Sequence, residues 1–129
     1  MYRIEPTSYG FKIRFEGFIE IDELKRWARE AATVMKQQKP GFGVLLDMRG
    51  MAPLPVDAGE FMKLNQTIAK DAGMGRSAQI LDDPITTMQF KRLARDTELL
   101  SDMRQIDASR TPDWEQAAIA WIVRGLEPE

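Results

Sequence analysis

Along the chain, the spacing of apolar residues changes from that of strands to that of helices and back. Near the N-terminus, apolar residues alternate with polar ones, which is the period-2 pattern of a half-buried strand. Turn residues from Pro6 to Gly10 interrupt this alternation. We therefore predict an antiparallel hairpin with strands at residues 2–5 and 11–16.

After this hairpin, segments of helical period alternate with short apolar runs. Apolar residues three and four positions apart predict four helices, at 21–38, from Asp57 to about 72, from 84 to about 98, and after Asp113 as far as Gly125. The intervening strands are predicted at 42–48, 76–82 and 103–107. The run 42–48 is almost entirely apolar, as expected of a central parallel strand that is covered on both faces. The prediction is one α/β domain over residues 1–129, with a mixed, mostly parallel five-stranded sheet, an N-terminal hairpin and four helices.

Several residues indicate where the helices begin and end. Asp57 and Glu60 match a capping box, which would open a helix whose apolar face holds Phe61, Leu64, Ile68 and Ala72. Asp83 followed by Pro84 is typical of an N-cap and a first helical residue. Gly125 is expected to end the last helix in a left-handed conformation.

Composition excludes many kinds of chemistry. The 129 residues include no cysteine and no histidine, which removes disulfides, thiol and imidazole catalysis and nearly all conventional zinc sites. A formal charge of −2 gives no bulk attraction to nucleic acid or to an anionic membrane. No apolar run approaches the roughly 20 residues of a membrane span, and no leader is recognisable. We predict a cytoplasmic, non-enzymatic protein without a cofactor or an integral membrane segment.

Three segments resemble those of a known family. They are Leu45–Met48, the loop leading into Val56–Gly59, and the closing stretch Asp113–Ile122 with its acidic start, alanines and Trp-Ile end. Together with the order of elements, they resemble the bacterial SpoIIAA-like (STAS-like) domains, the fold of the anti-sigma-factor antagonists. The resemblance implies a regulatory domain that binds a protein partner. It also implies an alternative, a carrier of a small apolar ligand or lipid, with a pocket between the sheet and the second and third helices.

The chain departs from the family pattern at one informative place. Regulated antagonists have Asp-Ser-(Ser/Thr)-Gly where this chain has Val56-Asp57-Ala58-Gly59, and no Ser or Thr lies between Arg49 and Asn65. The family switch places a dianionic phosphate at a helix N-terminus. Without a hydroxyl group, that phosphorylation switch cannot be built here.

The stretch 51–56 is unusually apolar and proline-rich for a loop. One interpretation is an exposed apolar surface at the carboxyl ends of the parallel strands, where open α/β sheets bind ligands. The other is that the loop folds back and covers the core of its own sheet. On the first interpretation, the predicted binding residues for a protein partner or a small apolar ligand are Met51, Pro53, Leu54, Pro55, Asp57, Ala58, Gly59 and Met62. The sequence leaves a homodimer open.

Other candidate residues have simpler structural explanations. Asp47, Asp82 and Asp83 follow predicted strands and could hold Mg²⁺, but capping and loop hydrogen bonds account for them better. The basic residues Lys91, Arg92 and Arg95 could dock an acidic partner, although a solvated face balanced by Asp96 and Glu98 is the simpler explanation. Core packing is the default for the three tryptophans, Trp27, Trp114 and Trp121.

Overall fold

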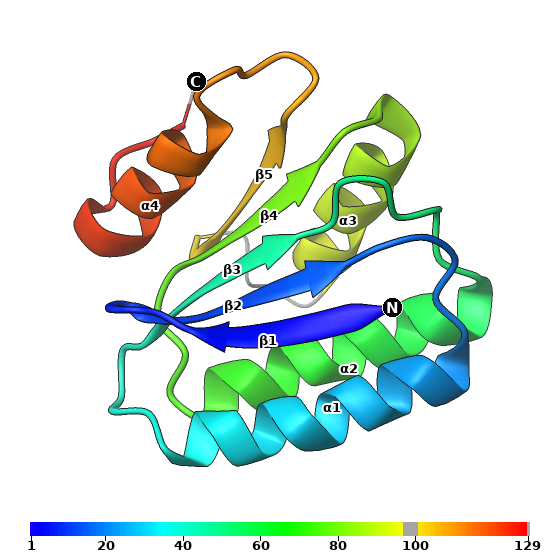
Figure 1. Cartoon of the computed structure of the whole chain (residues 1–129), viewed down its shortest axis with the longest axis horizontal. Coiled ribbons are helices and arrows are strands. Elements are labelled where there is room, and N and C mark those ends of the chain that lie inside the picture. The colour runs from blue at the N-terminus through cyan, green and yellow to red at the C-terminus, as the bar shows by residue number, and fades with distance from the viewer. Residues whose placement is uncertain (97–100, 129) are drawn as a thin grey trace.

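The chain forms five strands and four helices in the computed structural model, which describes residues 1–96 and 101–128. The strands are β1 (Tyr2–Pro6), β2 (Gly10–Phe15), β3 (Gly43–Asp47), β4 (Ser77–Leu81) and β5 (Met103–Asp107). The helices are α1 (Ile21–Lys36), α2 (Val56–Asp71), α3 (Pro84–Asp96) and α4 (Trp114–Arg124). The predicted order of elements is confirmed (Figure 1).

All five strands belong to one sheet with the order β1-β2-β3-β4-β5. β1 pairs antiparallel with β2, and the other neighbours are parallel. This arrangement confirms the predicted α/β class and its hairpin. β3 occupies the centre and is buried at all five positions, as predicted from its unbroken apolar run.

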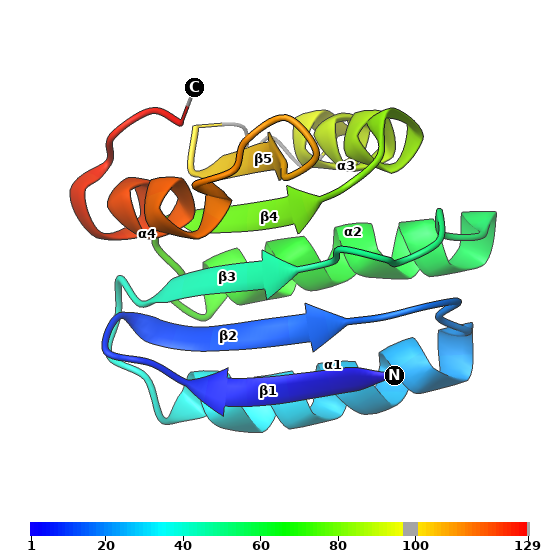
Figure 2. The same ribbon diagram turned by 45° about the horizontal axis from the view of Figure 1, so that its top comes forward.

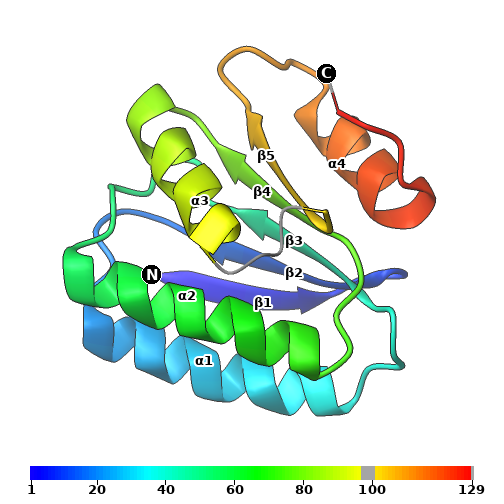
Figure 3. The same ribbon diagram turned by 180° about the vertical axis from the view of Figure 1, so that it is seen from behind.

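The helices cover the two faces of the sheet unequally. Helices α1, α2 and α3 lie on one face, and α4 lies alone on the other, against β3, β4 and β5 (Figures 1 and 3). The larger core lies under the three helices and includes Phe11, Phe15, Leu24, Met62 and Phe90. A smaller core under α4 includes Leu45, Ile80, Ile106, Trp121 and Ile122. Figure 2 shows that α4 leaves β1 and β2 uncovered on its side.

The prediction for the start and apolar face of α2 is wrong. The helix begins at Val56, and its N-cap residue is Pro55, which makes no side-chain cap hydrogen bond. Asp57 Oδ1 accepts a hydrogen bond from the neighbouring Ala58 amide (2.8 Å) rather than from an amide further along the helix among the described residues. The predicted inner face is largely outside, with Leu64 54% and Ile68 44% exposed. The buried face is instead formed by Ala58, Gly59, Met62 and Gln66. These residues also follow three- and four-residue spacing, so helical periodicity alone fits either face.

Two other predicted helix boundaries, the start of α3 and the end of α4, are confirmed, whereas α1 ends at Lys36 rather than at residue 38. Asp83 Oδ1 accepts a hydrogen bond from the Thr86 amide at 2.8 Å, which caps α3. Gly125 ends α4 with φ 69°. The predicted end of the third helix near residue 98 lies outside the described residues. None of the helices in residues 1–96 and 101–128 has the length and apolar character that crossing a bilayer requires.

Candidate functional site

The loop between β3 and α2 is held along the edge of the sheet where the parallel strands end. Met51 forms an isolated parallel bridge with Gly17, and the Ala52 amide donates to the Gly17 carbonyl at 3.1 Å. On the other side, the Gln89 side chain of α3 accepts a hydrogen bond from the Leu54 amide (3.1 Å) and donates to the Leu54 carbonyl (3.0 Å). The loop is therefore fixed to the β2–α1 connection on one side and to α3 on the other.

This anchoring turns the apolar side chains of the loop inward. Met51 is 3% and Leu54 7% exposed, and both belong to the larger core. The second interpretation of the loop, that it covers the core of its own sheet, therefore describes these two residues. Of the other predicted binding residues, Ala58, Gly59 and Met62 are buried, Pro55 is half-buried, and only Pro53 and Asp57 are exposed.

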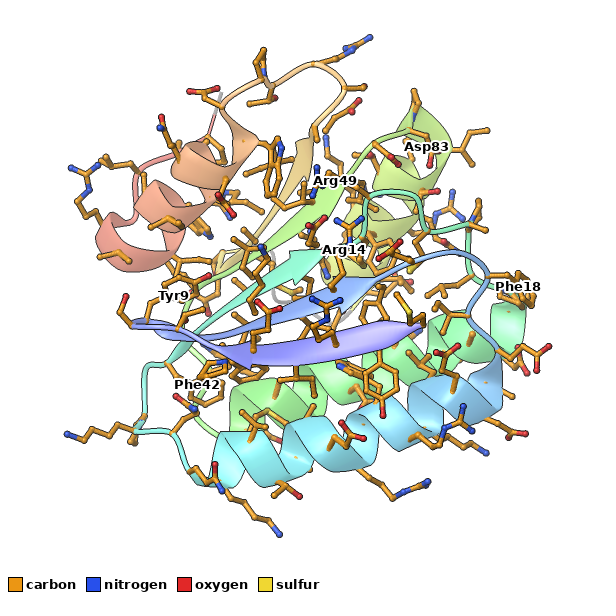
Figure 4. All side chains as sticks on the ribbon, in the orientation of Figure 1. Tyr9, Arg14, Phe18, Phe42, Arg49 and Asp83 are labelled. Carbon is orange, nitrogen blue, oxygen red and sulfur yellow. The ribbon has the colours of Figure 1, made fainter. Side chains whose placement is uncertain are left out.

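The same edge nevertheless exposes large apolar side chains that are not among the predicted binding residues, and of these only Val56 belongs to the apolar stretch 51–56. Phe18 (61% exposed) lies between β2 and α1, and Val56 (86%) is the first residue of α2. Ile85 (72%) and Met88 (64%) lie on the first turns of α3. In Figure 4, Phe18 and the α3 cap Asp83 both lie at the end of the molecule to which the parallel strands point. We call Phe18, Val56, Ile85 and Met88 the carboxyl-edge residues.

The positions of these residues in the sequence could have indicated that they lie at the carboxyl edge. Three of them occupy the first turns of helices that follow parallel strands, outside the apolar stripe of each helix. The helix starts themselves could be located, as the confirmed Asp83 cap shows. Residues at such positions lie at the carboxyl edge of the sheet by topology alone.

Acidic residues also lie at the carboxyl edge. Asp57 and Glu60 are exposed on the first turns of α2, and Asp82 is exposed at the end of β4. Asp82 Oδ2 accepts a hydrogen bond from the Gly50 amide at 2.9 Å, which ties it to the loop. The edge therefore combines apolar side chains with negative charge.

Asp47, at the end of β3, is the centre of a buried ion-pair cluster. Its carboxylate is 1% exposed and accepts hydrogen bonds from Arg14 Nη1 (2.6 Å) and from Arg49 Nε and Nη2 (both 2.9 Å). The Arg49 guanidinium also lies 4.4 Å from the centre of the Trp114 ring. The cluster thus joins β2, β3 and the start of the loop to α4.

The three candidate aspartates have separate structural roles. Asp47 pairs with two arginines, Asp82 binds a loop amide and Asp83 caps α3. Within residues 1–96 and 101–128, no group of three or more acidic side chains is placed to hold a metal ion.

The pKa of Asp47 gives the cluster a pH dependence. Burial would raise this pKa, but the hydrogen bonds from Arg49 and Arg14 outweigh burial and hold it below its ordinary value. A carboxyl group with a depressed folded-state pKa stabilises the fold above its unfolded pKa of about 4, and this stability is lost as pH falls further. Acidification below about pH 4 should therefore weaken the fold partly through Asp47.

We expect Asp47→Asn to reduce the free energy of unfolding by about 2 kcal/mol at pH 7, because two charged hydrogen-bond donors lose their anion. The partial exposure of both arginines keeps the loss below that of a fully buried pair. Urea unfolding from pH 7 to pH 3 measures it, with Asp71→Asn, at an exposed position, as control. The difference between Asp47→Asn and wild type should shrink below pH 4, and a constant difference would contradict this role.

The sheet face beside α4 carries a charged hollow that the sequence analysis did not identify. Its volume is about 280 Å³, and its lining consists of Arg3, Glu5, Lys12, Arg14, Glu16, Asp47 and Arg49. The sequence could have predicted this charged face from its period-2 pattern. The charged residues that alternate there with the inward-facing residues of the hairpin are Arg3, Glu5, Lys12 and Arg14. The cations have acidic neighbours, including Glu115 at 3.4 Å from Lys12. Because these positive and negative charges are paired and hydrated, this face of β1 and β2 can remain without a covering helix.

The remaining candidates lie where the simpler explanations place them. Lys91, Arg92 and Arg95 are exposed on α3, and Glu98 lies outside the described residues. Trp27 (6% exposed) and Trp121 (5%) are buried, and Trp114 is half-buried beneath Arg49.

A small cavity lies in the larger core. It has a volume of about 40 Å³, and residues of the sheet, α1 and α2 form most of its lining. The predicted ligand pocket was instead between the sheet and the second and third helices. At this size the cavity accommodates a few water-sized molecules rather than a lipid chain.

The chain matches no family model, no curated protein and no solved structure. The resemblance to STAS-like domains therefore remains a prediction from the sequence motifs.

Proposed function

We propose that this chain is a non-enzymatic, STAS-like regulatory domain that binds a protein partner through the carboxyl edge of its sheet. The observation that carries the proposal is the exposure of Phe18, Val56, Ile85 and Met88 on this one edge. Exposed apolar side chains that gather at one place favour an interaction surface, whereas isolated ones need no explanation. Open α/β sheets also bind their ligands at this edge.

The support beneath these side chains favours a preformed surface. The loop at 48–55 is fixed by the Gly17 bridge and by the paired hydrogen bonds of Gln89. Val56, Ile85 and Met88 project from helices rather than from loops. Because the loop and the helices are already ordered, the protein would lose little conformational entropy on binding.

The charges around the edge indicate the chemistry of the partner. Asp57, Glu60 and Asp82 are exposed at the same edge as the apolar residues, so a complementary surface would present apolar side chains together with Lys or Arg. Since Asp57, Ala58 and Gly59 offer no hydroxyl group, we propose that phosphorylation at this helix start does not control the interaction.

Substitutions that introduce a negative charge at the edge test this proposal. Val56→Asp and Ile85→Asp place a carboxylate in an apolar contact, but each lies in the first turn of a helix, where an acidic side chain is favourable. We expect both variants to fold normally and to bind the partner at least about tenfold more weakly. The measurement is affinity capture with quantitative mass spectrometry, followed by titration with the purified partner.

Val123→Asp is the matched control, because Val123 is an exposed valine (54%) on α4, on the opposite face of the sheet. Its partner affinity should stay within about twofold of wild type. The proposal would be contradicted if the partner bound equally well to all three variants, Val56→Asp, Ile85→Asp and Val123→Asp.

A further inference from the structure

The core cavity has polar atoms in its wall that lack partners. Trp27 Nε1, Ser77 Oγ and Gln79 Nε2 are buried and have no hydrogen-bond partner among the described residues. The exposed fractions of these residues are 6%, 0% and 0%, and all three line the cavity. A buried donor without an acceptor costs free energy, so three such groups around one space indicate a site for a hydrogen-bonding molecule.

The wall of the cavity restricts what could bind there. Among the described residues that line it, none carries a charge, and burying an ion without a counter-charge is costly. Trp27 Nε1 and Gln79 Nε2 can only donate, and Gln79 Oε1 already accepts a hydrogen bond from Gln105 Nε2 at 2.7 Å. The occupant must therefore be uncharged at its buried end and offer a hydrogen-bond acceptor.

The rest of the wall favours an apolar body on that molecule. Four methionines line the cavity, namely Met35, Met62, Met74 and Met103. Methionine side chains are flexible and polarisable, so they can rearrange around an apolar group of varied shape. The 40 Å³ volume is thus a lower limit for what this wall accommodates.

A surface hollow shares two lining residues with the cavity. It lies between α1 and α2, has a volume of about 350 Å³, and is lined by Ala28, Ala32, Phe61 and Ile68 among others. Met35 and Asn65 line both the hollow and the cavity, so they form the partition between them. Met35 is 9% exposed and unbranched, and its rotation would join the two spaces.

We propose that the cavity and this hollow together form a binding site for a small uncharged molecule with an apolar body and one carbonyl-type acceptor. The acceptor contacts Trp27 Nε1 and Gln79 Nε2, and the body extends past Met35 between α1 and α2. This site is separate from the carboxyl edge, so the ligand-binding proposal can be tested independently of the partner-binding proposal.

The test uses 2-heptanone as the probe and the indole N–H resonances of the full chain as the readout. Trp27 should shift saturably, while Trp114 and Trp121, which do not line the cavity, should stay unchanged. At about ten times its Kd, the ketone should raise Tm by about 5 °C. Heptanoate, which has the same chain length but a charged end, should bind at least tenfold more weakly.

Two variants remove the donors without removing packing volume. Gln79→Leu should weaken ketone binding at least tenfold, and because it also removes the acceptor of Gln105 Nε2, Tm of the free variant should fall. Ser77→Ala should weaken binding about threefold, with Tm of the free protein unchanged or raised. Gln116→Leu, at an exposed position on α4, should bind like wild type.

Two results would overturn the proposal. If Trp27 shows no saturable shift up to the solubility limit of the ketone, the cavity is a site for water only. If heptanoate binds as tightly as the ketone and Gln79→Leu has no effect, the probe is held by Lys25 and Arg29 at the surface hollow.

Discussion

Replacing Trp121 with alanine should reduce the free energy of unfolding by about 3–5 kcal/mol, a large part of the stability of an ordinary domain. Trp121 is 5% exposed and fills the core beneath α4. Its Nε1 donates a buried hydrogen bond to the Ser77 carbonyl at 3.0 Å, and Arg104 covers its ring at 4.0 Å. Among the described residues, α4 is the only helix on this face, so no neighbouring helix can fill the space.

Urea unfolding of two further variants separates the contributions of apolar burial and of the hydrogen bond to the free energy of unfolding. Trp121→Phe keeps most of the apolar area but loses the hydrogen bond, and should cost about 1–2 kcal/mol. Trp114→Ala removes a half-buried ring and its contact with Arg49, and should also cost about 1–2 kcal/mol. A loss below about 1 kcal/mol in Trp121→Ala would mean that α4 does not pack on the sheet as described.

Gly10→Ala should cost at least about 3 kcal/mol, because β2 and β3 meet too closely at this residue for a side chain. Gly10 pairs with Gly43, and a Cβ at Gly10 would overlap the Gly43 carbonyl oxygen and lie 2.9 Å from its nitrogen. The obstacle is backbone, so no side-chain rotation relieves it. Gly10 also has φ 153°, which L-residues rarely adopt.

Gly17→Ala is the matched control. Gly17 has φ 72°, but a Cβ there would meet no heavy atom within 4 Å. This variant should cost only the conformational strain, about 1 kcal/mol. If urea unfolding shows equal losses for Gly10→Ala and Gly17→Ala, the close approach of Gly10 and Gly43 is not a feature of the protein in solution.

The architecture could be predicted from the sequence because its signals are strong and local. The alternation at Ile4 and Ile13, the unbroken run of β3 and the cap at Asp83 each indicate one structure only. α2 is different, since the stripe at Phe61, Leu64 and Ile68 and the stripe at Ala58, Met62 and Gln66 both fit a helix. Periodicity does not choose between the two stripes, and only the tertiary packing of the helix does.

The candidate site was harder to predict than the fold. Periodicity cannot tell whether an apolar loop covers its own core or faces outward, and the position of Leu54 depends on Gln89, 35 residues away. Phe18 and Val56 lie at the predicted edge but outside the predicted set. The topology located the edge of interest, whereas long-range hydrogen bonds determined which side chains it exposes.

The most direct test of the partner-binding proposal is a backbone amide NMR titration of the labelled chain with its purified partner. The largest shift changes should map to residues 17–20, 50–57 and 83–88, which form the carboxyl edge. Changes centred instead on α4 or on the charged face of β1 and β2, with the carboxyl edge unaffected, would contradict the proposal.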